Sequence, residues 1–217
     1  DIDFDNTSKL IEEKFIFQTK SKNNVIPLID YKEHRTNRQE VVENDNTNQS
    51  KLSIACTLEN MTKFERNYVI NIYNLMLGGT ADSKFFKNIR EKYSLCYYAS
   101  SKSFKLDNVL LITSGISKEN YSKIMILIDK EMQDMRDGIF TDVDLEKAKK
   151  YYLSSIEEID DSLNQIIASY FAVDKFQVDD IEKRKEMIMK VTAQDVINIA
   201  NKVYIDTIFL LGGDKKW

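Results

Sequence analysis

Histidine is almost absent from this chain of 217 residues, in which His34 is the only one. Cysteine is nearly as rare, and Cys56 and Cys96 lie far apart in the sequence. A zinc site of the usual kind takes three or four nitrogen and sulfur ligands from histidine and cysteine. One histidine in a charged stretch and two separated cysteines do not provide such a set. The composition therefore excludes a self-contained zinc site of the usual kind, and we expect His34 to lie on the surface.

The sequence also shows no pattern of a disulfide framework, a membrane span or a signal peptide. Two cysteines are too few for a disulfide-stapled fold, and each lies in an apolar, strand-like segment, so we expect two buried free thiols. No apolar run approaches the ~18–20 residues that a membrane span needs, and the first residues carry no signal-peptide pattern. We therefore expect a protein of a reducing compartment, the cytoplasm, with no membrane partner.

No strong charge of one sign is present either. The chain has 31 Lys and Arg against 35 Asp and Glu, a net charge of -4, which argues against nucleic acid as the main partner. Its 42% hydrophobic and 30% charged residues are typical of a globular domain. The first residue is Asp1 rather than Met, so we expect a piece of a longer protein.

What the sequence does contain is a clear succession of periodic segments. The segment KLSIACTL alternates between Leu52, Ile54, Cys56 and Leu58 on one face and small residues on the other, as a half-buried strand does. The small face (Ser53, Ala55 and Thr57) is expected to line a cavity. The predicted order is a helix within 1–17, two strands within 40–58, helices over 62–79 and 82–92, strands over 95–105 and 109–116, helices over 117–135, 141–173, 181–189 and 192–203, and a strand over 205–211. Such an order predicts an α+β fold with an antiparallel or mixed sheet and helices packed on one face.

The stretch from Leu75 to Ser101 joins a helix end, a glycine pair, a short charged helix with Arg90 and a strand that begins with Leu95-Cys96-Tyr97-Tyr98. We expect Gly78-Gly79 to end the first helix at positions that need positive φ. No phosphate-binding pattern of the GxGxxG or GxxxxGK[ST] type follows these glycines, so a structural turn is favoured.

Taken together, these motifs resemble the insulinase-type (M16) zinc peptidases, and specifically the second of their two homologous halves. The resemblance covers residues 39–217, and the run from Ser83 to Ser101 is most similar to a bacterial branch in which one paralogue lacks the zinc motif. It rests on Gln49, Lys51-Leu52, Leu77-Gly78-Gly79, Asn88-Ile89-Arg90-Glu91-Lys92, Leu95-Cys96-Tyr97, Val191-Thr192-Ala193-Gln194-Asp195-Val196 and Ala200-Asn201-Lys202.

This resemblance implies a half-clamshell of the LuxS/metallohydrolase-like, ferredoxin-like type. In the family, the first half carries an inverted HxxEH zinc motif and the second half faces it across a chamber. The second half contributes an arginine and a tyrosine, here Arg90 and Tyr97, which bind substrate, and the tyrosine also stabilises the transition state. The motif HxxEH is absent here, so the chain alone is predicted to be inactive, with zinc expected in the other half or in a partner chain. Cys96 stands where the family often has Gly or Ala and is expected to narrow the approach to Tyr97.

The resemblance also divides the chain. Residues 1–17 resemble the end of a preceding homologous half, 18–38 the linker between halves, and 39–217 the C-terminal domain. Two functions fit: a substrate-clamping half of a zinc endopeptidase that acts on peptides or small unfolded proteins, or a non-catalytic subunit that pairs with a catalytic paralogue. A free-standing ferredoxin-like binding module is a third reading. The structural alternative for the site is that Arg90 pairs with a local acid and Tyr97 is a core aromatic.

Overall fold

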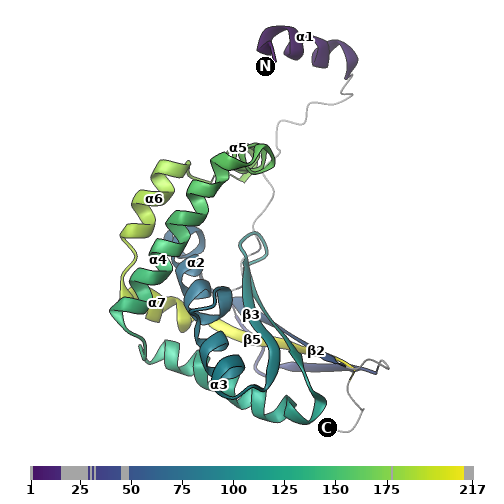
Figure 1. Ribbon diagram of the computed structural model, residues 1–217, viewed down its shortest axis with the longest axis vertical. Coiled ribbons are helices and arrows are strands. Elements are labelled where there is room, and N and C mark those ends of the chain that lie inside the picture. Colours follow the sequence, from purple (N-terminus) through teal and green to yellow (C-terminus); the bar gives the residue numbers. More distant parts are fainter. Residues whose placement is uncertain are drawn as a thin grey trace.

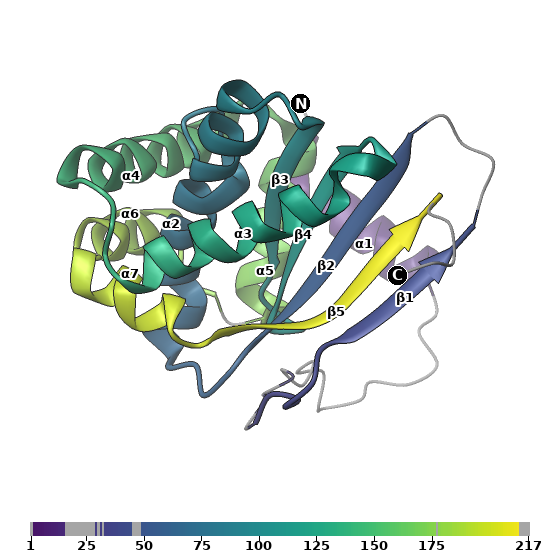
Figure 2. The ribbon, with the colours of Figure 1, turned by 90° about the horizontal axis from the view of Figure 1, so that it is seen from below.

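A single mixed sheet organises the chain. The computed structural model describes residues 2–15, 29, 31, 33–44, 49–176 and 178–212. The five strands follow the spatial order β1-β5-β2-β4-β3, and every neighbouring pair is antiparallel except β1 and β5, which are parallel. Figure 2 shows these strands side by side. Their bounds are β1 Gln39–Glu43, β2 Ser50–Leu58, β3 Cys96–Phe104, β4 Val109–Ile116 and β5 Val203–Leu211.

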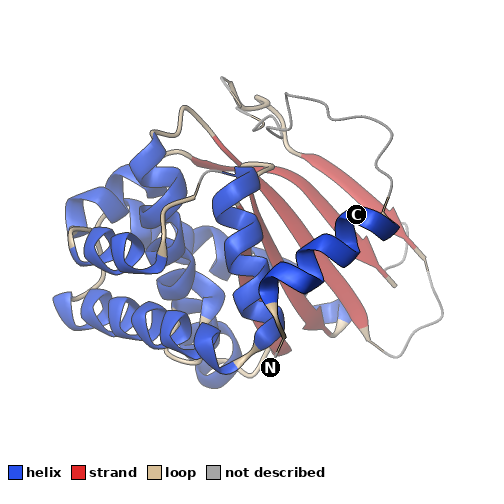
Figure 3. Cartoon of the chain, turned by 90° about the horizontal axis from the view of Figure 1, so that it is seen from above, coloured by secondary structure: helices blue, strands red, loops and turns tan. Residues whose placement is uncertain are grey.

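The helices from α2 to α7 gather on one side of this sheet, as Figures 1 and 3 show, so the predicted α+β class is confirmed. The α-helices are α1 Phe4–Lys14, α2 Ile70–Asn74, α3 Tyr121–Arg136, α4 Asp142–Glu157, α5 Leu163–Phe176, α6 Ile181–Met189 and α7 Ala193–Ala200. Turns of π-helix are η1 Glu65–Val69, η2 Leu75–Gly79 and η3 Phe85–Lys92, and turns of 3₁₀-helix are η4 Lys118–Asn120 and η5 Glu158–Asp161. No helix in the described part of the chain is long and apolar enough to cross a membrane.

The core lies between the sheet and these helices. Leu52, Ile54, Cys56 and Leu58 of β2 are all buried in it, as the alternation of this strand predicts. The opposite face of the sheet carries a cross-strand row of neighbours whose members are Val41, Phe209, Ser53, Thr113 and Ser100. We call this second side the open face, because the core cluster lies on the other side. Ser53 and Ala55 on it are half-buried, whereas Thr57 is buried.

The helical segment from residue 63 to 79 joins η1, α2 and η2 without a break. It begins with a capping box: the Thr62 backbone N–H donates to Glu65 Oε2 (2.8 Å), and the Glu65 N–H donates to Thr62 Oγ1 (3.2 Å). Lys202, at the turn before β5, donates to both carboxylate oxygens of Glu65, at 2.8 and 2.7 Å. This contact ties the start of the segment to the start of the last strand.

The prediction for Gly78-Gly79 was right about the position and wrong about the cause. Both glycines lie inside the last helical turn, η2, and neither has positive φ. A Cβ on Gly78 would lie 2.7 Å from a ring carbon of Phe85 and 2.8 Å from the backbone nitrogen of Ser101. Glycine is therefore required here by the close approach of η3 and β3, not by a left-handed backbone.

Several other predicted helix ends are confirmed. Thr141 and Thr192 form capping boxes with Asp144 and Asp195, and Gly138 has φ +70 after α3. The helix predicted over 141–173 is divided by η5 into α4 and α5. Ser117, in contrast, makes no side-chain capping bond, because a 3₁₀ turn precedes α3.

At the N-terminus, the predicted helix within 1–17 is α1, capped by Asp3, whose side chain accepts from the Asn6 N–H. No residue of α1 is buried. Most of the expected linker 18–38 lies outside the described residues, so the division at 17 and 38 stays a prediction.

Candidate functional site

A tight connection joins the helix that carries Arg90 to the strand that carries Tyr97. The Ser94 N–H donates to the Arg90 carbonyl (3.0 Å), and Ser94 adopts φ 51, in the left-handed region. The Asn120 side chain, from η4, donates to the Leu95 carbonyl (3.1 Å). These bonds fix where β3 begins relative to η3, so the positions of Arg90 and Tyr97 are set by backbone contacts.

A β-bulge then displays Tyr97. Cys96 pairs with Ile116 and Tyr98 pairs with Gly115, so one residue of β3, Tyr97, has no partner of its own on β4. The extra residue interrupts the alternation of buried and exposed side chains along the strand. Both Tyr97 and Tyr98 are exposed, and Ala99 is the next residue that is buried. Tyr97 is 68% exposed. Bulges are common next to functional sites because they redirect a side chain, and this one keeps Tyr97 out of the core.

Arg90 has partners within its own helix. Its guanidinium carbon lies 4.5 Å from the centroid of the Phe86 ring, and Nη1 lies 3.7 Å from Glu91 Oε1. The side chain is 40% exposed, so the pair with Glu91 is weak in free energy. The structural alternative, in which Arg90 pairs with a local acid and Tyr97 is a core aromatic, is therefore correct in part for Arg90. It is wrong for Tyr97, which is exposed.

Cys96 lies on the core side of β3, where it is half-buried against the core cluster. Burial raises the pKa of its thiol, and a hydrogen bond with Ser114 and the charge of Arg90 oppose this effect. The expectation of two buried thiols is therefore correct for Cys56 and only half correct for Cys96. Tyr97 itself is exposed, and the expectation that Cys96 narrows the approach to it stays a prediction.

Sequence reasoning missed the group that surrounds Tyr98. A Cβ on Gly115 would lie 2.6 Å from a ring carbon of Tyr98 and would overlap Gln49 Nε2. The Tyr98 ring therefore lies directly over the Gly115 backbone, with the Gln49 amide beside it. A signal for this contact was present, because glycine inside a strand often marks a close approach, and Gly115 lies inside β4.

The described residues do not fit a zinc site. No group of three or more His, Cys, Asp and Glu side chains lies close enough together among them to hold a metal ion. His34 is exposed, as expected, and its ring contacts Tyr204 and Glu59. Its ring stacks on Tyr204 at 3.8 Å between centroids, and Nδ1 lies 2.9 Å from Glu59 Oε1.

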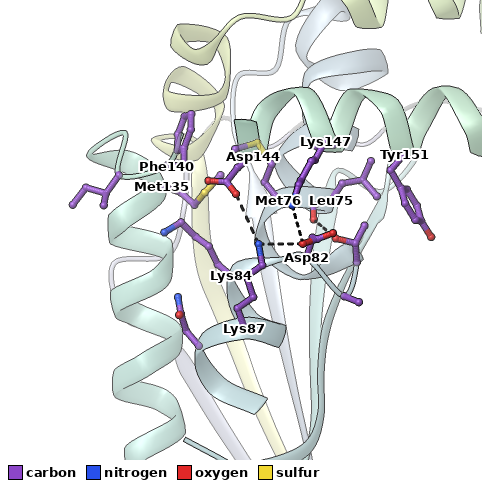
Figure 4. A pocket seen from close by; sticks show the side chains of 15 residues that line it. Leu75, Met76, Asp82, Lys84, Lys87, Met135, Phe140, Asp144, Lys147 and Tyr151 are labelled. Carbon is purple, nitrogen blue, oxygen red and sulfur yellow. Dashed lines mark hydrogen bonds and ion pairs between the residues drawn. The ribbon is translucent and has the colours of Figure 1, made fainter. Parts of the chain in front are cut away.

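A cavity of about 300 Å³ lies on the helical side, between η2, η3, α3 and α4 (Figure 4). Its lysines are paired with carboxylates: Lys87 and Lys147 lie 3.2 and 3.4 Å from Asp82, and Lys84 lies 3.4 Å from Glu131. With these charges neutralised inside the cavity, we assign it no ligand.

The comparisons with known proteins agree with this architecture. A family model described as the peptidase M16 inactive domain matches residues 1–152. The chain belongs to this family. This M16 chain is 27% identical over 217 residues to a protein of Bacillus subtilis named "Probable inactive metalloprotease YmfF". The alignment covers 98% of this chain and 50% of that relative. It is 25% identical over 156 residues to an "Uncharacterized zinc protease" of Rickettsia felis, covering 68% of the chain and 37% of the relative.

Solved structures show the same fold. A conserved protein from Enterococcus faecalis superimposes with a TM-score of 0.77 at 24% identity, over 87% of this M16 chain and 45% of that one. A protease from Helicobacter pylori superimposes with a TM-score of 0.73 at 15% identity, over 97% and 53%. The M16 inactive domain from Pseudomonas fluorescens gives 0.68 at 16% identity, over 82% and 44%. The chain spans 50% of the length of the Bacillus subtilis relative and 37% of the length of the Rickettsia felis relative.

Proposed function

We propose that this chain is the substrate-clamping, zinc-free half of an M16-type zinc-dependent peptidase that cleaves peptides or small unfolded proteins. The observation that carries the proposal is the bulge at Tyr97, which presents an exposed phenol at the start of β3. Family membership supports it, because relatives include proteins named as zinc proteases. The small residues of β2 on the open face would then line the substrate chamber.

The proposed chemistry needs only hydrogen-bond donors from this chain. The Tyr97 hydroxyl donates to the carbonyl oxygen of the scissile peptide as negative charge develops on it. The Arg90 guanidinium binds a carbonyl or carboxylate of the substrate through its fork of N–H donors. Backbone bonds around Ser94 hold the two residues in place before substrate arrives, which keeps the cost of positioning low.

Zinc, which would supply the activated water, belongs in this proposal to the catalytic half or to a partner chain. The described residues offer no set of ligands for it, and the only histidine is stacked on Tyr204. The partner is accordingly a homologous M16 half that carries the HxxEH motif.

A second candidate is a non-catalytic subunit that pairs with a catalytic M16 paralogue. The observations in its favour are the name of the Bacillus subtilis relative, which calls that protein probably inactive, and the family description. In this case Arg90 and Tyr97 are remnants of a site, and the chain contributes binding surface only.

Kinetics of the reassembled protein test the first proposal. The chain is combined with its catalytic half or partner, and cleavage of an unstructured peptide is followed. Tyr97→Phe is expected to lower kcat about 100-fold, the usual cost of one oxyanion donor. Arg90→Met is expected mainly to raise KM, because the arginine binds substrate and transition state alike.

Tyr93→Phe is the matched control, because Tyr93 is a partly exposed tyrosine in the preceding connection. It is expected to leave kcat and KM unchanged. Cleavage by Tyr97→Phe at the wild-type rate would eliminate the clamping role. If partner binding then persists, the subunit role is favoured.

We also infer a reducing compartment, the cytoplasm, from Cys56 and Cys96, which are both free thiols. Protein isolated without reductant and then unfolded should take up two alkyl groups per chain. An intermolecular disulfide in the isolated protein would contradict this inference.

A further inference from the structure

A second cavity, of about 250 Å³, lies where the β3–β4 turn meets the helical segment 63–79, α5 and α6. The charged groups that line it are Lys105 in the turn, Arg184 on α6 and Asp179 just before α6. Lys105 follows β3 at the end opposite Tyr97, and eight residues of strand correspond to roughly 26 Å. The cavity therefore has no part in the clamping role proposed above.

The two cations have no carboxylate partner among the described residues. Lys105 Nζ donates to the Asn67 carbonyl at 3.3 Å. Arg184 Nη2 donates to Ser169 Oγ at 2.9 Å, and its Nε is buried without a hydrogen-bond partner. Asp179, the one acid among the described residues that line this cavity, accepts a hydrogen bond from the Tyr68 hydroxyl. In the 300 Å³ cavity, by contrast, each of the three lysines discussed lies beside a carboxylate.

Burial of unpaired positive charge is costly, because the lost hydration is not replaced. Two like charges that face one cavity add repulsion to this cost. The effect is visible on Lys105, whose pKa is lowered to about 8 by burial and then by the charge of Arg184. An anion between the two side chains would remove both costs and would also accept from the orphaned Arg184 Nε.

We propose that this cavity binds a small oxyanion, a carboxylate or a phosphate, held by Lys105 and Arg184. Arg184 supplies directional N–H donors, and Lys105 supplies a compact charge. Phe176 and Val178 give the cavity an apolar wall, so a short carbon chain attached to the anion also fits.

The affinity is expected to depend on pH through Lys105. The groups that face this cavity from the surrounding elements are Tyr68, Asp179 and Arg184, and Tyr152 of α4 faces Arg184. Burial raises the pKa of Tyr68 and of Tyr152, so both stay neutral near pH 8. Lys105 alone then changes charge in this range. Anion binding is therefore strong below pH 8 and declines as the pH rises through about 8.

Calorimetric titration of the intact chain with inorganic phosphate, and separately with succinate, tests the proposal at pH 7 and at pH 9.5. Lys105→Met and Arg184→Met should each weaken binding at pH 7 by about tenfold or more. Lys102→Met is the matched control, since Lys102 is an exposed lysine three residues earlier on β3, and it should bind as wild type does. Whichever anion binds more tightly identifies the phosphate or the carboxylate class.

Lys105→Arg keeps the positive charge and abolishes its titration near pH 8. It should bind at pH 9.5 nearly as well as at pH 7, whereas wild type loses affinity. This variant also separates a loss of charge from a loss of folding. The proposal is overturned if neither anion binds saturably, or if Lys102→Met weakens binding as much as Lys105→Met does.

Discussion

Gly78 shows how much of this domain depends on single close contacts. A methyl group there would meet the Ser101 backbone nitrogen at 2.8 Å, and that nitrogen belongs to the ladder-forming strand β3. It cannot move aside without moving the strand that presents Tyr97. Gly115 differs, because its nearest atoms belong to the side chains of Gln49 and Tyr98, which can rotate.

We therefore expect Gly78→Ala to lower the free energy of unfolding by about 1–3 kcal/mol, the usual cost of overpacking. Gly115→Ala should cost less and should instead displace the Tyr98 ring. Urea unfolding of both variants measures the first effect, and the Tyr98 ring signals in NMR report the second. An equal or smaller loss for Gly78→Ala would show that β3 yields to the added methyl group.

Among the secondary-structure elements, the segment 63–79 depends on the contact between Glu65 and Lys202. Burial raises the pKa of Glu65, but the hydrogen bonds from Lys202 and Thr62 outweigh it and hold the pKa below its usual value of 4.5. A carboxylate with a lowered folded-state pKa adds stability above pH 4.5, and the gain is lost as the pH falls through the folded-state value. The contact also gives the Ala200-Asn201-Lys202 motif a structural role.

Glu65→Gln should therefore lower the stability at pH 7 by about 1–2 kcal/mol, the range for a charge-assisted bond with some exposure. The difference from wild type should shrink as the pH falls below 4.5. Thermal unfolding from pH 3 to pH 7 measures this. Glu186→Gln is the control: it pairs with Lys183 and Lys190 on the surface of α6 and should leave stability nearly unchanged. A difference that does not depend on pH would contradict the role assigned to the Glu65 charge.

At the scale of the whole molecule, α5 carries an exposed apolar surface. Four of its large apolar residues recur at helical spacing and are all exposed: Leu163, Ile167, Tyr170 and Phe171. A stripe of this kind is typical of a surface that meets another protein. The proposed function places a second M16 half beside this chain, and this stripe is the candidate surface for that contact.

We expect the isolated chain to self-associate through this stripe. Replacing Leu163 and Ile167 together by Glu should reduce association in sedimentation velocity and leave the melting temperature unchanged, because neither side chain is buried. Ile126→Glu is the matched control, since Ile126 is an exposed apolar residue on α3, and it should not change association. Equal association of the α5 variant and wild type would refute this assignment.

The candidate site was only partly accessible from the sequence. Arg90 and Tyr97 came from the family resemblance, and their roles stay predictions. The bulge that displays Tyr97 could not be predicted, because it depends on which β4 residue each β3 residue pairs with. The same holds for Tyr98 over Gly115, and for Lys105 facing Arg184 across 79 positions of sequence.

The sequence by itself determined the elements, their order and the buried side of β2, since caps such as Thr141 and Thr192 and the alternation of KLSIACTL act over a few residues. Only the tertiary structure decided why Gly78 is a glycine, which face Cys96 and Tyr97 occupy, and where positive charge stays unpaired. These properties depend on contacts between distant segments, and steric exclusion and charge burial are set by such contacts and not by local pattern.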